Sequence, residues 1–468
     1  MSEVQQSGEG LQKTLKQRHI NMIAIGGVIG AGLFVGSGAV INAAGPGAIF
    51  CYALTGILVV FVMRMLGEMS VASPSTGSFA VYAGEALGHW AGYTIGWLYW
   101  FAWVMLVAFE ATAGAGIIHG IWPVIPNWVT CIVLTTLLAF VNSISVKSYG
   151  EFEYWFAMIK VAAIVLFLII GFAVIFNLYP AMKSPGFSNF LDRGGLFPNG
   201  LGAIGTGCLM VIFSYFGVEI AAIASNETPD PAKNVKMAIN TVIWRILIFY
   251  IGSLTVITFL VPWNSTAVMQ SPFVTTMQEI GIPGAAAIMT FVVITAVFSC
   301  LNSGLYTSSR MLYGIAEKGE APKMFLKLNK HGVPITALIF STVVSYIAAA
   351  FNYISPEKVF VFLINASGAV ALLVFLIIAV SEIILRKRAE RNGEELEFKM
   401  WGFPYLTYIT IACLGAVVVG MFTVPDLRSQ VLTTLGFGVA VVASYFLFFK
   451  KSQDKNKNAE EYQKVSGN

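Results

Sequence analysis

Long apolar segments, separated by short polar or turn-forming stretches, run through almost the whole chain. A helix needs about 20 mostly apolar residues to cross a bilayer, and twelve segments satisfy this requirement. The predicted spans are 20–42, 45–68, 91–118, 127–145, 153–177, 201–225, 241–262, 281–309, 334–352, 357–385, 404–424 and 430–449. Turn-forming sequences separate several neighbours, as AAGPG does for the first two spans. The pattern therefore predicts an all-α membrane protein with 12 transmembrane helices.

Composition and charge agree with a membrane protein and indicate its orientation. Hydrophobic residues make up 57% of the 468 positions and charged residues 11%, whereas soluble domains carry about 25% charged residues. If the N-terminus lies inside and the spans alternate, 23 of the 28 lysines and arginines fall on the inner side. Because cytoplasmic loops carry an excess of basic residues, we expect both termini to be cytoplasmic and the chain to lie in the bacterial inner membrane.

The first span contains the glycine-rich sequence IGGVIGAGLF, with Gly26, Gly27, Gly30 and Gly32. Glycine costs about 1 kcal/mol relative to alanine inside a helix, so the cluster needs a reason. A dinucleotide-binding loop is excluded, because the spacing differs from GxGxxG and no strand is predicted before it. Two interpretations remain: close helix packing through GxxxG pairs, and a helix break whose backbone groups line a cavity.

The sixth span has a similar weak point in VIFSYFGVEIAAIASNETPDP, which contains Ser214, Gly217 and Glu219. Two weakened helices five spans apart are typical of inverted five-helix repeats, whose broken helices bind solute near mid-membrane. A carboxylate at membrane depth is costly unless it is paired or protonated. Glu219 is therefore a functional candidate.

The two weak helices also define the predicted organisation of the chain. The predicted parts are a cytoplasmic arm at 1–19, a transporter core at 20–385 with repeats at 20–177 and 201–385, a cytoplasmic loop at 386–403, helices 11 and 12 at 404–449, and a cytoplasmic tail at 450–468. The last two helices lie outside the predicted repeats.

Four further ionisable residues in the spans need an interpretation. Lys160, about two turns into the fifth span, either reaches the inner interface with its long side chain or exchanges a proton, because desolvation favours its neutral form. Glu110, in the middle of the third span, is either a structural partner for a polar group on a neighbouring helix or a second proton site. Glu68 and Glu382 lie near inner helix ends, where solvation or ion pairing is sufficient.

Polar residues in the eighth span have two possible roles. Ser299, Asn302, Ser303 and Thr307 partly share one helix face, so they either hold helices together or line a solute path. Elsewhere, the five cysteines form no CxxC pair and the four histidines form no HExxH motif. We therefore expect no metal site, no cofactor and no enzymatic centre.

Several segments together resemble a known family. They are LKQRHINMIAIGGVIGAGLFVGSG, MRMLGEM, GEFEYWFAMIKV, FSYFGVEIAAIASNETPDP, CLNSGLYTSSRMLYGIAEKGEAP and KMWGFPYLT. The chain resembles the bacterial amino acid transporter family of the amino acid–polyamine–organocation superfamily, from the N-terminal arm to the eleventh span. Among its subfamilies, SVKSYGEFEYWF and CLNSGLYTSSRMLY look most similar to γ-aminobutyrate permeases.

The resemblance implies a five-plus-five inverted-repeat fold, proton-coupled uptake and a set of site residues. By the family pattern, backbone amides in the first span hold the substrate carboxylate, and carbonyls of the first and sixth spans meet its ammonium. The implied substrate-binding positions are Val28, Gly30, Ala31, Gly32, Phe213, Ser214, Phe216 and Gly217. Glu219 and Lys160 match the residues implicated in proton coupling, and Phe213 or Phe216 matches an aromatic gate. Some relatives have serine where Ala31 stands, which leaves the substrate's identity open.

The resulting hypothesis is a symporter that imports a small zwitterionic amino acid, γ-aminobutyrate or a related neutral one, by alternating access. The proton gradient is the expected driving force, and membrane lipids, rather than nucleic acid, are the expected surroundings. Amino acid exchange and transport of alanine, serine or proline remain alternatives. A sodium-coupled mechanism is disfavoured by Lys160, whose charge would replace that of the ion. Whether Glu219 or Lys160 carries the proton stays open.

Overall fold

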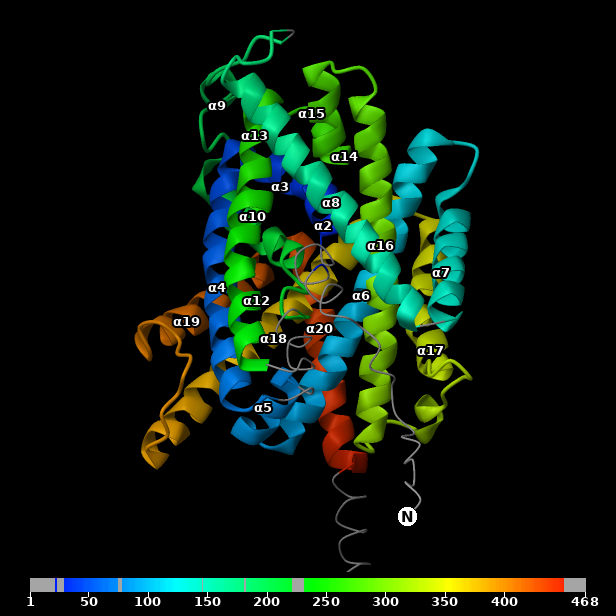
Figure 1. Cartoon of the computed structure of the whole chain (residues 1–468), viewed down its shortest axis with the longest axis vertical. Helices are drawn as coiled ribbons and strands as arrows, with labels where there is room; N and C mark the ends of the chain where they lie inside the picture. The colour runs from blue at the N-terminus through cyan, green and yellow to red at the C-terminus, as the bar shows by residue number, and fades with distance from the viewer. Residues whose placement is uncertain are drawn as a thin grey trace, which may run out of the picture.

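The computed structural model describes residues 22, 29–74, 78–144, 146–180, 182–220 and 231–449. Within these ranges the regular structure is helical, apart from one isolated bridge between Leu328 and Pro334. The helices form an elongated bundle, with the short helices α9, α14 and α15 at one end and α5 at the other (Figure 1).

The longer helices and the short segments between them are as follows. The α-helices are α2 (Ala31–Phe34), α3 (Gly36–Ala44), α4 (Ala48–Ala72), α5 (Ser78–Leu87), α6 (His89–Ile121), α7 (Asn127–Ile144), α8 (Val146–Ile175), α9 (Ser188–Leu191), α10 (Gly200–Ser214), α12 (Pro231–Arg245), α13 (Ser253–Leu260), α14 (Thr266–Gln270), α15 (Pro272–Ile280), α16 (Ala285–Glu317), α17 (Ile335–Asn352), α18 (Pro356–Asn392), α19 (Tyr405–Thr423) and α20 (Pro425–Ser444). The 3-10 segments are η2 (Gly45–Gly47) and η4 (Lys323–Leu326), and the π-helical segments are η3 (Ile246–Gly252) and η5 (Tyr445–Phe449).

Ten stretches of the described chain are long and apolar enough to cross a membrane. The first of them, Ala31–Ala72, joins the first two predicted spans, because only the short turn η2 separates α3 from α4. The sixth predicted span corresponds to the shorter apolar helix α10, and each remaining predicted span coincides with one of the other nine stretches. The predicted all-α membrane fold is confirmed. The inverted repeats and the domain limits drawn from them stay predictions.

At both weak points found in the sequence, the described backbone departs from helical geometry. In the first span, Gly30 is extended (φ −135°, ψ −149°) just before α2, and Val35 leaves helical geometry between α2 and α3. In the sixth span, α10 ends at Ser214 and Gly217 has φ +94°, a conformation that glycine adopts without steric cost. Backbone N–H and C=O groups are therefore free of helix bonding inside the bundle.

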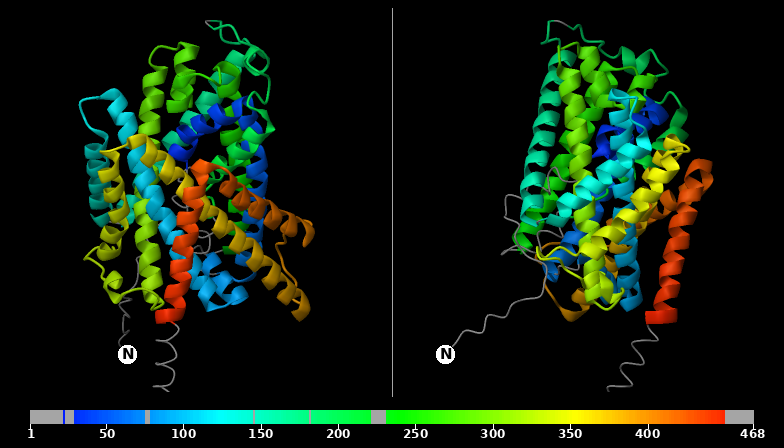
Figure 2. Two further views of the ribbon diagram at one scale, coloured as in Figure 1. Left: turned by 180° about the vertical axis from the view of Figure 1, so that it is seen from behind. Right: turned by 90° about the vertical axis from the view of Figure 1, so that its right-hand side faces the viewer.

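α6 forms the centre of the bundle, and the last two helices lie at its edge. α6 packs against α16, α18, α5, α17 and α7. In its most apolar window 78% of the residues are buried, against 22% in α19 and 24% in α20. Figure 2 shows α20, in red, standing along one side of the bundle. The last two helices therefore present most of their apolar surface to the outside, where a bilayer would solvate it.

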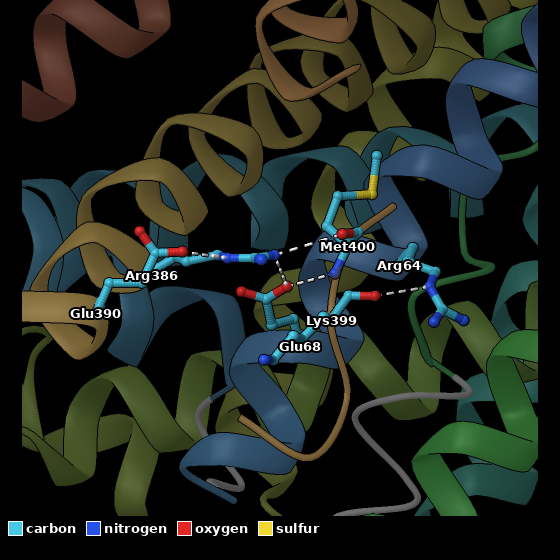
Figure 3. Close-up of polar contacts among 6 residues, drawn as sticks. All are labelled: Arg64, Glu68, Arg386, Glu390, Lys399 and Met400. Carbon is cyan, nitrogen blue, oxygen red and sulfur yellow. Dashed lines mark hydrogen bonds and ion pairs between the residues drawn. The ribbon is translucent and has the colours of Figure 1, made fainter. Parts of the chain in front are cut away.

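A polar cluster ties the segment after α18 to the end of α4 (Figure 3). Arg386 donates to a Glu68 carboxylate oxygen at 2.8 Å, and the backbone N–H of Met400 also donates to that oxygen. Arg64 donates to the Lys399 carbonyl at 3.0 Å. The ion-paired interpretation of Glu68 is confirmed.

Glu382, the other carboxyl group predicted at an inner helix end, has a different environment. Its side chain is fully buried, so solvation is wrong for it. Neither of its carboxyl oxygens has a hydrogen-bond partner among the described residues.

Candidate functional site

The start of α2 binds a carboxylate that belongs to the protein itself. The backbone N–H of Ala31 donates to both carboxylate oxygens of Glu110, at 3.1 and 3.2 Å. Glu110 projects from the middle of α6 and is 1% exposed. The expectation that Glu110 partners a polar group on a neighbouring helix is confirmed. That group is the amide which the family pattern assigns to the substrate carboxylate.

Gly30 is necessary at this point because of crowding rather than backbone conformation. A Cβ atom added to Gly30 would meet a Glu110 carboxylate oxygen and would lie 2.5 Å from the Cys300 sulfur. At Gly32, an added Cβ would lie 3.3 Å from the Ser214 Cα atom. The start of α2 is therefore enclosed by α6, α16 and the end of α10, and the structure brings these predicted positions of the first and sixth spans together.

Hydrogen bonds hold the end of α10 against the first span. The Ser214 hydroxyl donates to the Gly32 carbonyl at 3.0 Å, so the Tyr52 hydroxyl, 3.2 Å from the Ser214 Oγ atom, must donate to it. The Ser214 carbonyl accepts from the Tyr250 hydroxyl at 2.9 Å, and the Tyr52 carbonyl accepts from Tyr215 at 2.8 Å. The break in the sixth span is thus satisfied by tyrosines from α4 and η3, both absent from the sequence-based prediction.

Tyr250 lies in an irregular part of its helix. The π-helical segment η3 inserts between α12 and α13 and contains this residue. π-Helical turns inside α-helices are frequent at functional sites. In the sequence, Tyr52 and Tyr250 stand out only as tyrosines within apolar spans. A buried tyrosine normally finds a partner for its hydroxyl, but the sequence does not show which partner.

Glu219 lies directly after the break in the sixth span, as predicted. Both of its carboxylate oxygens accept from the Gly217 N–H, at 3.2 and 3.1 Å. Glu219 is fully buried and Arg245, which is 2% exposed, interacts with it electrostatically from the end of α12. The carboxylate therefore has both a backbone donor and a positive partner.

The two candidate gate residues pack against α6. The Phe213 ring meets the Phe109 ring at 4.6 Å between centroids, and the Phe216 ring lies 5.4 Å from Trp103 and 5.7 Å from Tyr99. Both phenylalanines are 4% exposed. Their position between the break and α6 agrees with a gate, which stays a prediction.

Lys160 is fully buried, so the interpretation in which it reaches the membrane interface is wrong. Its ammonium donates to the Ser299 hydroxyl at 2.8 Å and lies 3.8 Å from a Glu153 carboxylate oxygen. The Ser299 hydroxyl in turn donates to Glu153 at 2.5 Å. Glu153 was missed because the predicted fifth span begins at it, where a carboxylate is normally solvated.

The secondary candidates on the eighth span are buried on α16. Asn302 accepts at 2.7 Å from the side-chain amide of Asn142 on α7, so its visible role is to join two helices. Ser303 is 5% exposed. Val28 lies outside the described residues. Within the ranges that are described, no group of three or more His, Cys, Asp or Glu side chains is placed to hold a metal ion.

A bundle of helices long and apolar enough to cross a membrane, in which two non-helical points pack against each other, is typical of multi-pass membrane transporters. The family model described as amino acid permease matches residues 19–459. The chain therefore belongs to the amino acid permease family, as the resemblance of its motifs indicated, and it is not an enzyme.

Relatives and solved structures agree with this assignment. The chain is 53% identical to the γ-aminobutyric acid permease of Bacillus subtilis over 97% of both chains, and 44% identical to that of Escherichia coli over 93% of this chain and 94% of the relative. It is also 40% identical to an aromatic amino acid transport protein of Corynebacterium glutamicum, over 94% of this chain and 96% of the relative. A mutant manganese transporter of Eremococcus coleocola shares the fold, with a TM-score of 0.57 at 14% identity over 91% of this chain and 92% of the transporter.

Proposed function

We propose that the protein imports γ-aminobutyrate, or a related small neutral amino acid, together with a proton by alternating access. Two relatives that are 53% and 44% identical along nearly their whole length are named γ-aminobutyric acid permeases, which supports this substrate class. Exchange and transport of alanine, serine or proline are the alternatives that the experiment below separates.

One observation carries the proposal: the Ala31 amide is occupied by the Glu110 carboxylate. A substrate carboxylate that binds the same amide must displace Glu110. A buried carboxylate that loses its donor is costly as an anion, so displacement favours the protonated acid. Binding of the anionic end of the substrate and uptake of a proton are then linked at one position.

The rest of the zwitterion is accommodated by the neighbouring break. The carboxyl end of α10 presents carbonyls, and the C-terminal end of a helix carries partial negative charge. In this proposal the ammonium of the substrate binds at these carbonyls, close to Phe213 and Ser214, and its carboxylate binds at the start of α2. Lys160 interacts electrostatically with Glu110, so a proton on either group changes the charge felt by the other. Glu219, on the far side of the break, remains the second candidate for the coupled proton.

The test uses purified protein in proteoliposomes whose membrane potential is clamped at zero. With one coupled proton, an inward gradient of one pH unit supports about tenfold accumulation of a neutral substrate. The wild type is expected to accumulate γ-aminobutyrate to this level without internal substrate, whereas an obligate exchanger would not. Competition by alanine, serine and proline identifies the preferred substrate.

Glu110→Gln is the decisive variant, because glutamine keeps the shape of the side chain but can neither take up nor release a proton. It should retain counterflow exchange and lose the gradient-driven accumulation. Accumulation by this variant at the wild-type level would contradict the proposal. Lys160→Ala and Glu219→Gln, measured in parallel, show whether either of them also carries the coupled proton.

A further inference from the structure

Three buried side chains form a connected group beside the site. Lys160 and Glu153 come from α8, and Ser299 comes from α16. The Lys160 ammonium donates to the Ser299 hydroxyl at 2.8 Å, and that hydroxyl donates to Glu153 at 2.5 Å. All three side chains are 0% exposed. A serine hydroxyl that donates and accepts at once links the lysine to the carboxylate.

The group starts at the site and extends away from it. Ser299 directly precedes Cys300, whose sulfur borders Gly30, and Lys160 interacts electrostatically with Glu110 and Cys300. Glu153 lies seven residues before Lys160, which is about 10 Å along the helix axis and toward the start of α8. That direction leads away from α9 (Figure 1) and toward the side predicted to be cytoplasmic.

The chemistry of the group fits the movement of one proton. The positive ammonium and the negative carboxylate can become a neutral amine and a neutral acid without a change in total charge. Burial disfavours the separated charges, so the ionised and neutral forms of the pair are closer in free energy than they would be in water. The second carboxyl oxygen of Glu153, Oε2, has no hydrogen-bond partner among the described residues.

We propose that Glu153 accepts the proton that Lys160 gives up, with Ser299 as the bridge between them. The Ser299 hydroxyl passes its proton to the Glu153 carboxylate, forming an O–H bond there, and takes one proton from the Lys160 ammonium. The lysine ends as an amine, the serine is restored and the glutamate ends as a carboxylic acid. Glu153 then gives the proton to water on the side predicted to be cytoplasmic, and the neutral Lys160 amine takes up the proton carried by Glu110, with which it interacts electrostatically. The titratable groups that face this path are Lys160 and Glu153 on α8, Glu110 on α6 and Cys300 on α16.

This inference rests on the proposed proton symport, and the test is designed to separate the two. Glu153→Gln keeps an oxygen that accepts from Ser299 but cannot take up a proton. It is expected to retain counterflow exchange and to lose the accumulation of about tenfold that a gradient of one pH unit supports in the wild type. Ser299→Ala, which removes the bridging hydroxyl, should likewise retain counterflow exchange and lose accumulation. Ser299→Thr, which keeps a hydroxyl, should accumulate substrate like the wild type.

Thr295→Val is the matched control. Thr295 is a buried hydroxyl residue one turn away on α16, and its hydroxyl donates within its own helix to the Val292 carbonyl at 2.8 Å. The control should accumulate substrate like the wild type.

Each outcome either supports or overturns the relay. If the wild type fails to accumulate substrate, the symport proposal fails. If Glu110→Gln loses accumulation while Glu153→Gln and Ser299→Ala keep it, the relay alone is wrong. Loss of counterflow in both Glu153→Gln and Ser299→Ala would assign the group a structural role and overturn the relay. If Glu153→Gln does not fold, the contrast between Ser299→Ala and Ser299→Thr decides the question.

Discussion

Gly30→Ala tests the most specific structural claim about the site, which is that α2 begins too close to α6 and α16 for any side chain. The added methyl group would overlap a Glu110 carboxylate oxygen and would lie 2.5 Å from the sulfur and 2.8 Å from the Cβ atom of Cys300. Because Gly30 is extended, at φ −135°, alanine is compatible with the backbone itself. The expected effect is therefore steric and local.

The size of the effect follows from what must move. Adding a methyl group to a filled interior costs about 1–3 kcal/mol. If Glu110 also moves away from Ala31 in the substrate-free protein, a hydrogen bond to a charged group worth about 1.5–3 kcal/mol is lost. This loss lowers the melting temperature and does not raise KM, because the substrate displaces Glu110 from that amide in any case. At 1.4 kcal/mol for each factor of ten, a cost of 1.4–2.8 kcal/mol that falls on the substrate complex raises KM by about 10- to 100-fold.

The assay is the concentration dependence of γ-aminobutyrate counterflow, together with the melting temperature of the purified protein. Gly116→Ala on α6 is the matched control, because an added Cβ there meets nothing within 4 Å. Removal of the sulfur by Cys300→Ala should partly restore the Gly30→Ala variant, with an effect that is not additive, since the two positions are in contact. A KM for Gly30→Ala equal to that of Gly116→Ala would refute the steric argument.

Two further variants test buried polar contacts. Arg386→Ala leaves the Glu68 carboxylate, which is 2% exposed, without its ion partner, so the protein should be destabilised by about 3–5 kcal/mol. Its melting temperature should fall well below that of Arg391→Ala, an exposed control on the same helix, and equal values would contradict the prediction. Tyr250→Phe removes the donor to the Ser214 carbonyl and should cost about 1–3 kcal/mol. Because the ammonium of the substrate can occupy the freed carbonyl, saturating γ-aminobutyrate should stabilise this variant more than the wild type, and an equal shift in melting temperature would contradict that reasoning.

The spans were predictable because the requirement that produces them is local. The third predicted span, 91–118, and the helix α6, His89–Ile121, differ by a few residues at each end. The larger differences occur where a helix continues beyond its apolar part. The seventh predicted span begins at 241, whereas α12 begins at Pro231, because polar residues can extend a helix outside the bilayer. The start of α8 at Val146 instead of 153 has the same explanation.

The candidate site was predicted in part. Glycine and a mid-span glutamate marked the two weak points, and the structure packs Gly32 of the first against Phe213 and Ser214 of the second. Tyr250 and Glu153 were missed, because tyrosine is common in membrane helices and a carboxylate near the beginning of a span is normally solvated. Neither residue is unusual until its partners, Ser214 and Ser299, are known.

The sequence by itself determined the helical membrane fold and the two places where the backbone leaves helical geometry. These properties depend on runs of apolar residues and on glycine, which act over a few neighbouring positions. Only the tertiary structure decided which groups satisfy the exposed backbone. Glu110 lies 79 residues from Ala31, and Ser214 lies 182 residues from Gly32. A buried donor or acceptor must find a partner, and helix packing brings these distant residues together.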